Sequence, residues 1–292
     1  MQLPEVERVV HWSELREMCV GAEAAGFDSV WVGDHLLYRG DDRPERGPLD
    51  AWSVLAALAA STERVELGPL VTCTGFRPPG LLARTAAAVD DISGGRLVLG
   101  LGCGWNRAEF EAFGYPYSRR VDRFAEAFDM VRRLLSGERV TTRGEFFELR
   151  DAVLHPAPLR RPPLMIGSNS PRMLSIALPH VERWNTWWDD FSNTAEGFAK
   201  LNESITAAAE RAGRDPTEIH RSACLLVELD PATKERRVPD GVTPVRGGAD
   251  AVAAALDEMA QAGADEVILV ADPINLSSID ELGEALAVLG ND

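Results

Sequence analysis

The stretch SVWVGDHLL, residues 29–37, runs from an apolar segment directly into two neighbouring side chains that can exchange protons. Residues 30–32 are typical of a buried strand, and Gly33 is followed by Asp34 and His35. An acid and an imidazole at the end of a buried strand indicate a functional site. The residues alone fit a structural alternative equally well, in which Asp34 caps the next turn and His35 makes a local hydrogen bond.

Units of one strand followed by one helix recur along the whole chain. The apolar runs predict strands at 2–4, 28–32, 65–71, 97–101, 164–166, 183–188, 223–229 and 266–270. Helical periodicity and end signals predict helices that include 50–62, 79–92, 195–212 and 249–262. Eight such units favour a closed (β/α)₈ barrel over an open doubly wound sheet. We therefore expect an α/β protein with one barrel domain over residues 1–292.

Two segments interrupt this alternation, and the first strand is short. Residues 138–158 alternate like a hairpin and predict an excursion outside the barrel, while residues 231–248 predict an irregular loop. A first strand of residues 2–4 is below the usual strand length of about five or six residues. Either this strand is weakly held or the native chain begins upstream of Met1.

Composition narrows the classes of function. A net charge of −16 argues against nucleic-acid binding, which needs a basic face. The sequence has no apolar run of membrane-spanning length and no signal-peptide pattern at Met1, so a cytoplasmic protein is expected. The four cysteines have no CxxC or CxxH spacing, so they indicate neither a zinc site nor a disulfide framework.

Barrel enzymes collect their chemistry on the loops that follow the carboxyl ends of the strands. Here those loops contain Glu5 and Glu7, Asp34-His35, the segments 72–75, 102–106 and 167–172, and residues 185–188. The segments GCGWN (102–106) and GSNSPR (167–172) are typical of anion or cofactor sites, because exposed backbone can approach a ligand closely, although neither pattern is specific by itself. No HxH or paired carboxylate set appears, so no metal is expected. The pair Trp187-Trp188 is read as packing rather than as a cofactor wall.

Four segments resemble the luciferase-like monooxygenase superfamily, and within it the oxidoreductases that use the deazaflavin coenzyme F420. They are GFDSVWVGDHLL (26–37), LAALAASTERVELGPLVTCTGFRPPGLLAR (55–84), DDISGGRLVLGLGCGWNRAEFEAFGYP (90–116) and LMIGSNSPRML (164–174). The resemblance runs from about Leu3 to Trp187 and is fainter beyond.

This resemblance implies a (β/α)₈ barrel with a tricyclic ring across its mouth. It makes His35 the catalytic residue beside the ring. It also implies a bulge after the third strand, often with a cis peptide that does not precede proline, behind the ring. The cofactor-binding residues that it implies are Asp34, Leu70, Val71, Thr72, Gly102, Gly104, Asn106, Gly167, Ser168 and Asn169.

Members that oxidise sugar phosphates have a glutamate where this chain has Trp105, so a sugar phosphate is not the expected substrate. We expect hydride transfer between F420 and a small organic substrate. The alternatives are an FMN-dependent monooxygenase and a non-catalytic flavin-binding barrel; a metal-dependent hydrolase lacks its ligands. Residues 36–48, 140–154 and 231–248 are expected to shape the substrate pocket. Dimers are common in families of this kind, so a homodimer is considered.

Overall fold

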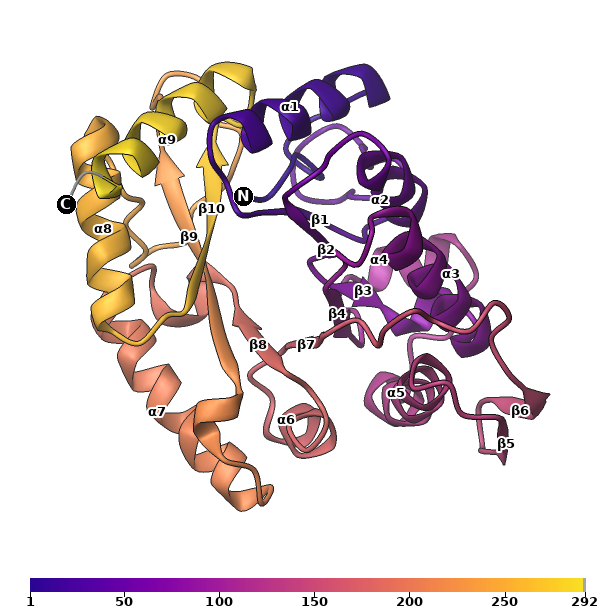
Figure 1. Ribbon diagram of the computed structural model, residues 1–292. Coiled ribbons are helices and arrows are strands. Elements are labelled where there is room, and N and C mark those ends of the chain that lie inside the picture. The colour runs from indigo at the N-terminus through magenta and orange to yellow at the C-terminus, as the bar shows by residue number, and fades with distance from the viewer. Residues whose placement is uncertain (291–292) are drawn as a thin grey trace.

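The protein is a closed eight-stranded parallel barrel surrounded by helices (Figure 1). A computed structural model describes residues 1–290. After the first segment at Gln2, the barrel strands are β1 (Ser29–Val32), β2 (Glu66–Pro69), β4 (Leu99–Gly102), β7 (Leu164–Gly167), β8 (Arg183–Thr186), β9 (His220–Glu228) and β10 (Glu266–Asp272). The expected fold class is therefore confirmed.

The short first segment closes the barrel between its first and last long strands. Gln2 forms a parallel bridge to Trp31 of β1, and its backbone N–H donates to the carbonyl of Leu269 in β10 at 3.0 Å. A second single bridge joins Leu67 of β2 to Leu97, just before β4. The first strand is thus one bridging residue, in line with its predicted shortness.

The helices lie outside the strands and occur close to where the sequence predicts them. They are α1 (Trp12–Ala24), α2 (Ala51–Ala59), α3 (Pro79–Ile92), α4 (Arg107–Ala112), α5 (Arg120–Leu135), α6 (Pro171–Ala177), α7 (Ala195–Arg211), α8 (Gly248–Gln261) and α9 (Leu276–Leu289). α1 lies beside α9, so the first and last helices are neighbours where the barrel closes (Figure 1). None of the helices within residues 1–290 is long and apolar enough to cross a membrane.

Two predicted strands end earlier than expected. The strand predicted at 183–188 stops at Thr186, because Trp188 begins a 3₁₀ helix, η2 (Trp188–Phe191). The strand predicted at 65–71 is interrupted after Pro69, and a short strand β3 (Thr72–Cys73) then pairs with β4. Between them lies a cis peptide at Leu70–Val71, so the bulge implied by the family resemblance is present.

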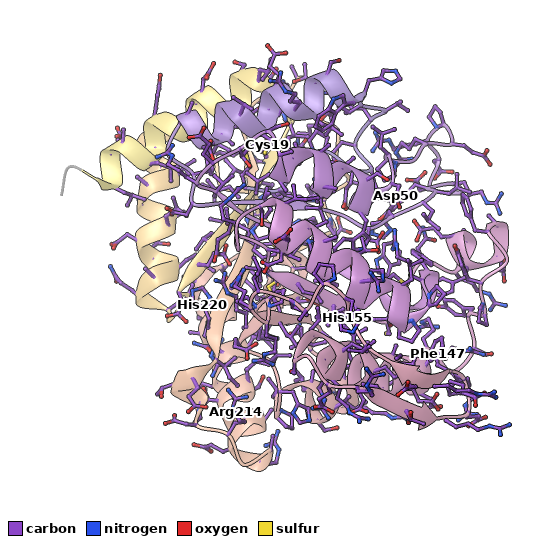
Figure 2. The ribbon with its side chains drawn as sticks, turned by 45° about the vertical axis from the view of Figure 1, so that its right-hand side comes forward. Cys19, Asp50, Phe147, His155, Arg214 and His220 are labelled. Carbon is purple, nitrogen blue, oxygen red and sulfur yellow. The ribbon has the colours of Figure 1, made fainter. Side chains whose placement is uncertain are left out.

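The predicted excursion is an antiparallel hairpin of β5 (Val140–Arg143) and β6 (Glu148–Ala152). It lies outside the barrel, and Phe147 and His155 lie on the same outer side (Figure 2). Arg84 of α3 donates to the carbonyl of His155 at 3.1 Å, which fixes the return segment to the barrel wall. The other predicted interruption, 231–248, has no regular element apart from the start of α8 at Gly248 and one bridge at Val245.

Val71 occupies a hollow that three glycines of neighbouring strands leave open. A Cβ at Gly102 would lie 2.7 Å from Val71 Cγ2, and one at Gly167 would lie 2.8 Å from Val71 Cγ1. A Cβ at Gly100 would lie 3.0 Å from Val71 Cγ1 and 2.2 Å from the carbonyl oxygen of Pro69. The missing side chains therefore allow the bulge after β2 to press against β4 and β7.

We expect Gly167→Ala to lower the free energy of unfolding by about 1–3 kcal/mol, because its methyl group would overlap Val71. Combined with Val71→Ala, it should cost less than the sum of the two single changes. Urea unfolding of the four proteins of this cycle measures both effects.

Gly21→Ala is the matched control, since the nearest atom to a Cβ in that position of α1 is 3.9 Å away. It should be neutral or stabilising by about 0.5–1 kcal/mol. If the stability losses of Gly167→Ala and Val71→Ala simply added up in the double variant, Val71 would not occupy the space beside Gly167.

Candidate active site

The carboxyl ends of the strands surround one cavity of about 680 Å³. Eight of the eleven residues predicted for the site line it, namely Asp34, His35, Leu70, Val71, Gly102, Gly104, Gly167 and Ser168. Residues from β1, the bulge, β4 and β7 therefore meet at one end of the barrel, as the strand-end argument predicts.

The other three predicted residues lie behind this wall. Thr72 is fully buried. Asn106 caps α4, accepting from the backbone N–H of Ala108 at 3.3 Å and donating to the carbonyl of Leu37 at 3.0 Å. Asn169 donates to the hydroxyl of Thr186 at 3.0 Å. Thr72, Asn106 and Asn169 would therefore act on a ligand in the cavity only indirectly, through neighbouring residues.

Asp34 ties the end of β1 to the start of β3. Its Oδ2 accepts from the backbone N–H of Cys73 at 3.0 Å and from Arg77 at 2.6 Å, and Arg77 also binds Asp50, the N-cap of α2. Burial raises the pKa of Asp34, while the charge of Arg77 acts in the opposite direction. Asp34 therefore positions the bulge next to His35 while its Oδ1 has no protein partner.

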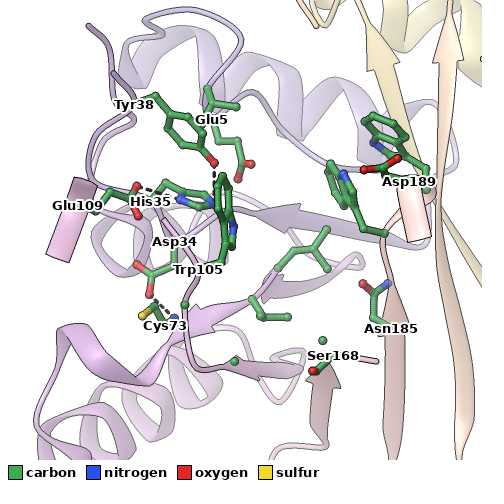
Figure 3. Close-up of a pocket in the computed structure, with 18 of the residues that line it drawn as sticks. Glu5, Asp34, His35, Tyr38, Cys73, Trp105, Glu109, Ser168, Asn185 and Asp189 are labelled. Carbon is green, nitrogen blue, oxygen red and sulfur yellow. Dashed lines mark hydrogen bonds and ion pairs between the residues drawn. The ribbon is translucent and has the colours of Figure 1, made fainter. Parts of the chain in front are cut away.

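His35 is held by a carboxylate that no sequence pattern predicted for the site (Figure 3). Its Nδ1 lies 2.9 Å from Oε1 of Glu109, a residue of α4 that is only 1% exposed. The same oxygen accepts from the backbone N–H groups of Leu36 and Leu37 at 3.0 and 3.2 Å. Glu109 stands in the quoted segment 90–116, but only the folded chain brings α4 against the end of β1.

Tyr38 is the second residue that sequence reasoning missed. Its hydroxyl oxygen lies 2.9 Å from His35 Nε2, so both imidazole nitrogens have partners. The ring of Trp105 packs edge-on against the imidazole, with the ring centroids 5.7 Å apart, although Trp105 is 64% exposed at the cavity. Trp105 thus lies directly beside His35 at the edge of the cavity.

Buried carboxylates control the charge of His35. Burial by itself lowers the pKa of His35, but the hydrogen bond to Glu109 and the charges of Glu5 and Glu109 leave it above the ordinary value. Burial raises the pKa of Glu5 to about 7, opposed mainly by the charge of His35. A Cβ at Gly33 would lie 1.1 Å from Glu5 Oε2, so only glycine at that position lets Glu5 lie against the end of β1.

The remaining walls come from the loops, with one departure from expectation. Segments 36–48 and 231–248 line the cavity through residues such as Arg43 and Arg236. The segment 140–154 contributes nothing to it, because its hairpin lies on the outside of the barrel. The prediction that this segment shapes the pocket was therefore wrong. Trp187 and Trp188, read as packing residues, both line the cavity.

The cavity is suited to a flat heterocycle with polar edges. Leu70 and Val71 form an apolar surface, and the neighbouring glycines expose backbone. Among the described residues, five that line the cavity have buried polar atoms without a hydrogen-bond partner in the protein: Glu5 Oε2, Glu7 Oε1, Asp34 Oδ1, Trp188 Nε1 and Arg236 Nε. Within residues 1–290, no group of three His, Cys, Asp or Glu side chains has the arrangement of a metal site.

The model of the family described as luciferase-like monooxygenase matches residues 2–238 of this sequence. The chain belongs to the luciferase-like monooxygenase family. It is 32% identical over 223 residues to the F420-dependent hydroxymycolic acid dehydrogenase of Mycobacterium tuberculosis, covering 75% of this chain and 60% of that protein. This luciferase-like chain spans about three fifths of the length of the curated relatives that it matches.

Solved structures of the luciferase-like fold support the same architecture. An F420-dependent secondary alcohol dehydrogenase in complex with an F420–acetone adduct superposes with a TM-score of 0.82 at 20% identity, covering 98% of this chain and 96% of that chain. A monooxygenase from Streptomyces bottropensis superposes with a TM-score of 0.75 at 24% identity, covering 95% and 94%. At these identities the likeness establishes the fold.

Replacing the carboxylate of Glu109 should change the titration of His35. We expect Glu109→Gln to lower the pKa of His35, because the amide keeps an acceptor for Leu36 and Leu37 but removes the negative charge. The stability that the charged pair adds should be present below about pH 6.5 and lost as pH rises through the folded-state pKa, and it should shrink in the variant. Ring-nitrogen NMR titration of the histidines measures the shift.

Glu111→Gln is the matched control on the same helix, since Glu111 pairs with Arg107 at the surface. It should leave the titration of His35 unchanged. A His35 pKa that is the same in Glu109→Gln and in the original protein would contradict the pairing.

Proposed function

We propose that this protein is an oxidoreductase that transfers a hydride between coenzyme F420 and a small organic alcohol or carbonyl compound. The observation that supports this proposal best is the position of His35, which is held between Glu109 and Tyr38 beside a cavity lined by Leu70 and Val71. Relatives named as F420-dependent dehydrogenases add support. The reaction needs a proton to leave or reach the substrate oxygen, and His35 is placed for that task.

In this proposal Leu70, Val71 and His35 would contact the cofactor ring. The backbone of Gly102, Gly104 and Gly167, together with Ser168, would hold its phosphate-bearing tail. Hydrogen bonds of Asp34, Asn106 and Asn169 keep these surfaces in place, and Thr72 pairs with Leu101 of β4 through its backbone. When bound, the deazaflavin supplies a two-electron hydride donor or acceptor.

His35 supplies the acid or base in this proposal. Glu109 orients the imidazole and stabilises its charged form, so His35 holds a proton at a higher pH than a free histidine does. Reduction of a carbonyl should therefore slow as pH rises through the raised pKa of His35. Oxidation of an alcohol needs neutral His35 and should have the opposite dependence.

An FMN-dependent monooxygenase is the second candidate, because a monooxygenase has the same fold. A non-catalytic flavin-binding barrel is the third. We also expect a cytoplasmic location, a small-molecule substrate and no nucleic-acid partner, and a homodimer is a further expectation that light scattering tests.

Titration of the purified protein with F420 and, separately, with FMN decides between the first two candidates. We expect F420 to bind more tightly, followed by the change in its fluorescence. Oxidation is assayed with F420 and propan-2-ol, cyclohexanol or 1-phenylethanol. Reduction is assayed with reduced F420 and the corresponding ketones. Preference for FMN together with oxygen consumption would refute the proposal, and binding without turnover of any compound would favour the non-catalytic barrel.

His35→Ala should keep F420 affinity within about threefold and lose about 10²–10⁴-fold in kcat, because a general acid or base acts only as the hydride moves. His35→Asn should bind equally well and recover none of the rate. Titration and steady-state assays measure the two effects. His155→Ala is the control, because His155 lies outside the barrel and away from the cavity (Figure 2). Turnover of His35→Ala close to that of the original protein would contradict an acid–base role.

A further inference from the structure

The hydroxyl group of Tyr38 faces one of the two imidazole nitrogens of His35. It lies 2.9 Å from His35 Nε2, and Tyr38 itself lines the cavity. The phenol is held firmly, because Tyr38 and Arg46 exchange two backbone hydrogen bonds of 2.7 and 3.1 Å. The Arg46 guanidinium also lies over the Tyr38 ring, 5.6 Å from its centroid. Any substrate group that approaches Nε2 must therefore share that position with a fixed hydroxyl.

Glu109 determines which imidazole nitrogen gains and loses the proton. Its Oε1 already accepts two backbone N–H groups, from Leu36 and Leu37, so the third group that faces it acts as a donor. Nδ1 of His35 therefore carries a hydrogen in both the neutral and the charged imidazole. Only Nε2 changes its protonation, and its partner is Tyr38.

The Tyr38 hydroxyl then reverses its direction with the charge of His35. When the imidazole is neutral, the Tyr38 O–H donates to Nε2. When it is charged, Nε2–H donates to the Tyr38 oxygen, and the hydrogen of Tyr38 is free to point elsewhere. Burial, followed by the charge of Glu5, raises the pKa of Tyr38 well above its ordinary value, so the group remains a phenol between turnovers. A phenol with a free O–H beside a cavity is a proton donor to whatever lies in it.

We propose that Tyr38 is the catalytic residue that gives the proton to the substrate oxygen, or takes it away, and that His35 acts through Tyr38 as its proton reservoir. The inference rests on the proposed function and changes which atom touches the substrate. Glu109, His35 and Tyr38 would form a chain in which each member has one role: anchor, reservoir and donor.

The step balances for reduction of a carbonyl compound. A hydride with its two electrons passes from the reduced deazaflavin to the carbonyl carbon, and the carbonyl π bond becomes an electron pair on oxygen. The Tyr38 O–H bond breaks as its proton joins that oxygen. The proton on His35 Nε2 moves to the Tyr38 oxygen, which leaves a neutral imidazole that solvent reprotonates. Oxidation of the alcohol is the reverse.

The hydrogen-bonded chain is tested first without cofactor or substrate. The sequence has five histidines, so ring-nitrogen NMR of the complete protein gives few signals, and the signals missing from His35→Asn identify His35. Above the His35 titration, we expect a proton on Nδ1 and a bare Nε2 that accepts a hydrogen bond. Tyr38→Phe should keep this tautomer and shift the Nε2 resonance toward that of a nitrogen without a donor. A proton on Nε2, or an Nε2 resonance unchanged by Tyr38→Phe, would overturn the proposal.

The proton transfer is then tested with F420 and the ketones named above. Tyr38→Phe keeps the ring contacts and deletes one hydroxyl, so F420 affinity should stay within about threefold while kcat falls about 10²–10⁴-fold. Because the two residues act in series, Tyr38→Phe with His35→Ala should lose little more than either change alone. The kinetic effect of deuterated water on the hydride step should disappear in Tyr38→Phe.

Tyr115→Phe is the matched control, since Tyr115 packs against Phe76 and does not line the cavity. It should leave both the NMR spectrum and the rate unchanged. A Tyr38→Phe protein that keeps its rate within about tenfold and retains the solvent isotope effect would show that His35 protonates the substrate directly. A protein that shows the Nε2 signature but binds no F420 contradicts the proposed function and not the hydrogen-bonded chain.

Discussion

The contact between Val71 and three glycines determines the shape of the barrel mouth. With no side chains at Gly100, Gly102 and Gly167, the segment after β2 can move inward until Val71 touches both β4 and β7. Leu70 and Val71 then present an apolar wall to the cavity. A single methyl group on any of these three glycines, two on β4 and one on β7, would push this wall outward, so the position of the wall depends on the missing side chains.

Three buried carboxylates near this wall have three different environments. Asp34 is paired with Arg77, so it remains a structural tie between β1 and β3. Glu109 binds backbone N–H groups and the imidazole of His35, which favours the charged form of that ring. At Glu5, burial outweighs the opposing charge of His35 and raises the pKa to about 7. In a chain of net charge −16, burial and local partners, rather than the overall charge, set the protonation of the site.

The cavity wall that faces away from the strands depends on contacts between segments that are distant in the sequence. Arg43 donates to the carbonyl groups of Glu235, at 2.5 Å, and of Glu7. Arg236 pairs with the carboxylate of Glu7 and lies over the Trp187 ring, 5.4 Å from its centroid. Arg43 and Arg236, two arginines that line the cavity, therefore already have partners within the protein. This arrangement joins residues 5–8, 36–48 and 231–248 into one wall above the strands.

The sequence by itself determined the barrel, its strand ends and the presence of Asp34 and His35 at one of them. Alternating apolar runs and helix-end signals are local, and parallel strands place their carboxyl ends together whatever the loops do. The last residue of a strand did not follow from these local signals: β8 ends at Thr186, because packing places a 3₁₀ helix directly after it. Only the tertiary structure brought Glu109 and Tyr38 to the two nitrogens of His35 and moved the 140–154 hairpin away from the cavity. Those partners lie on a helix 74 residues away and on a loop without periodicity, and hydrogen bonds of that kind leave no repeating pattern in a sequence.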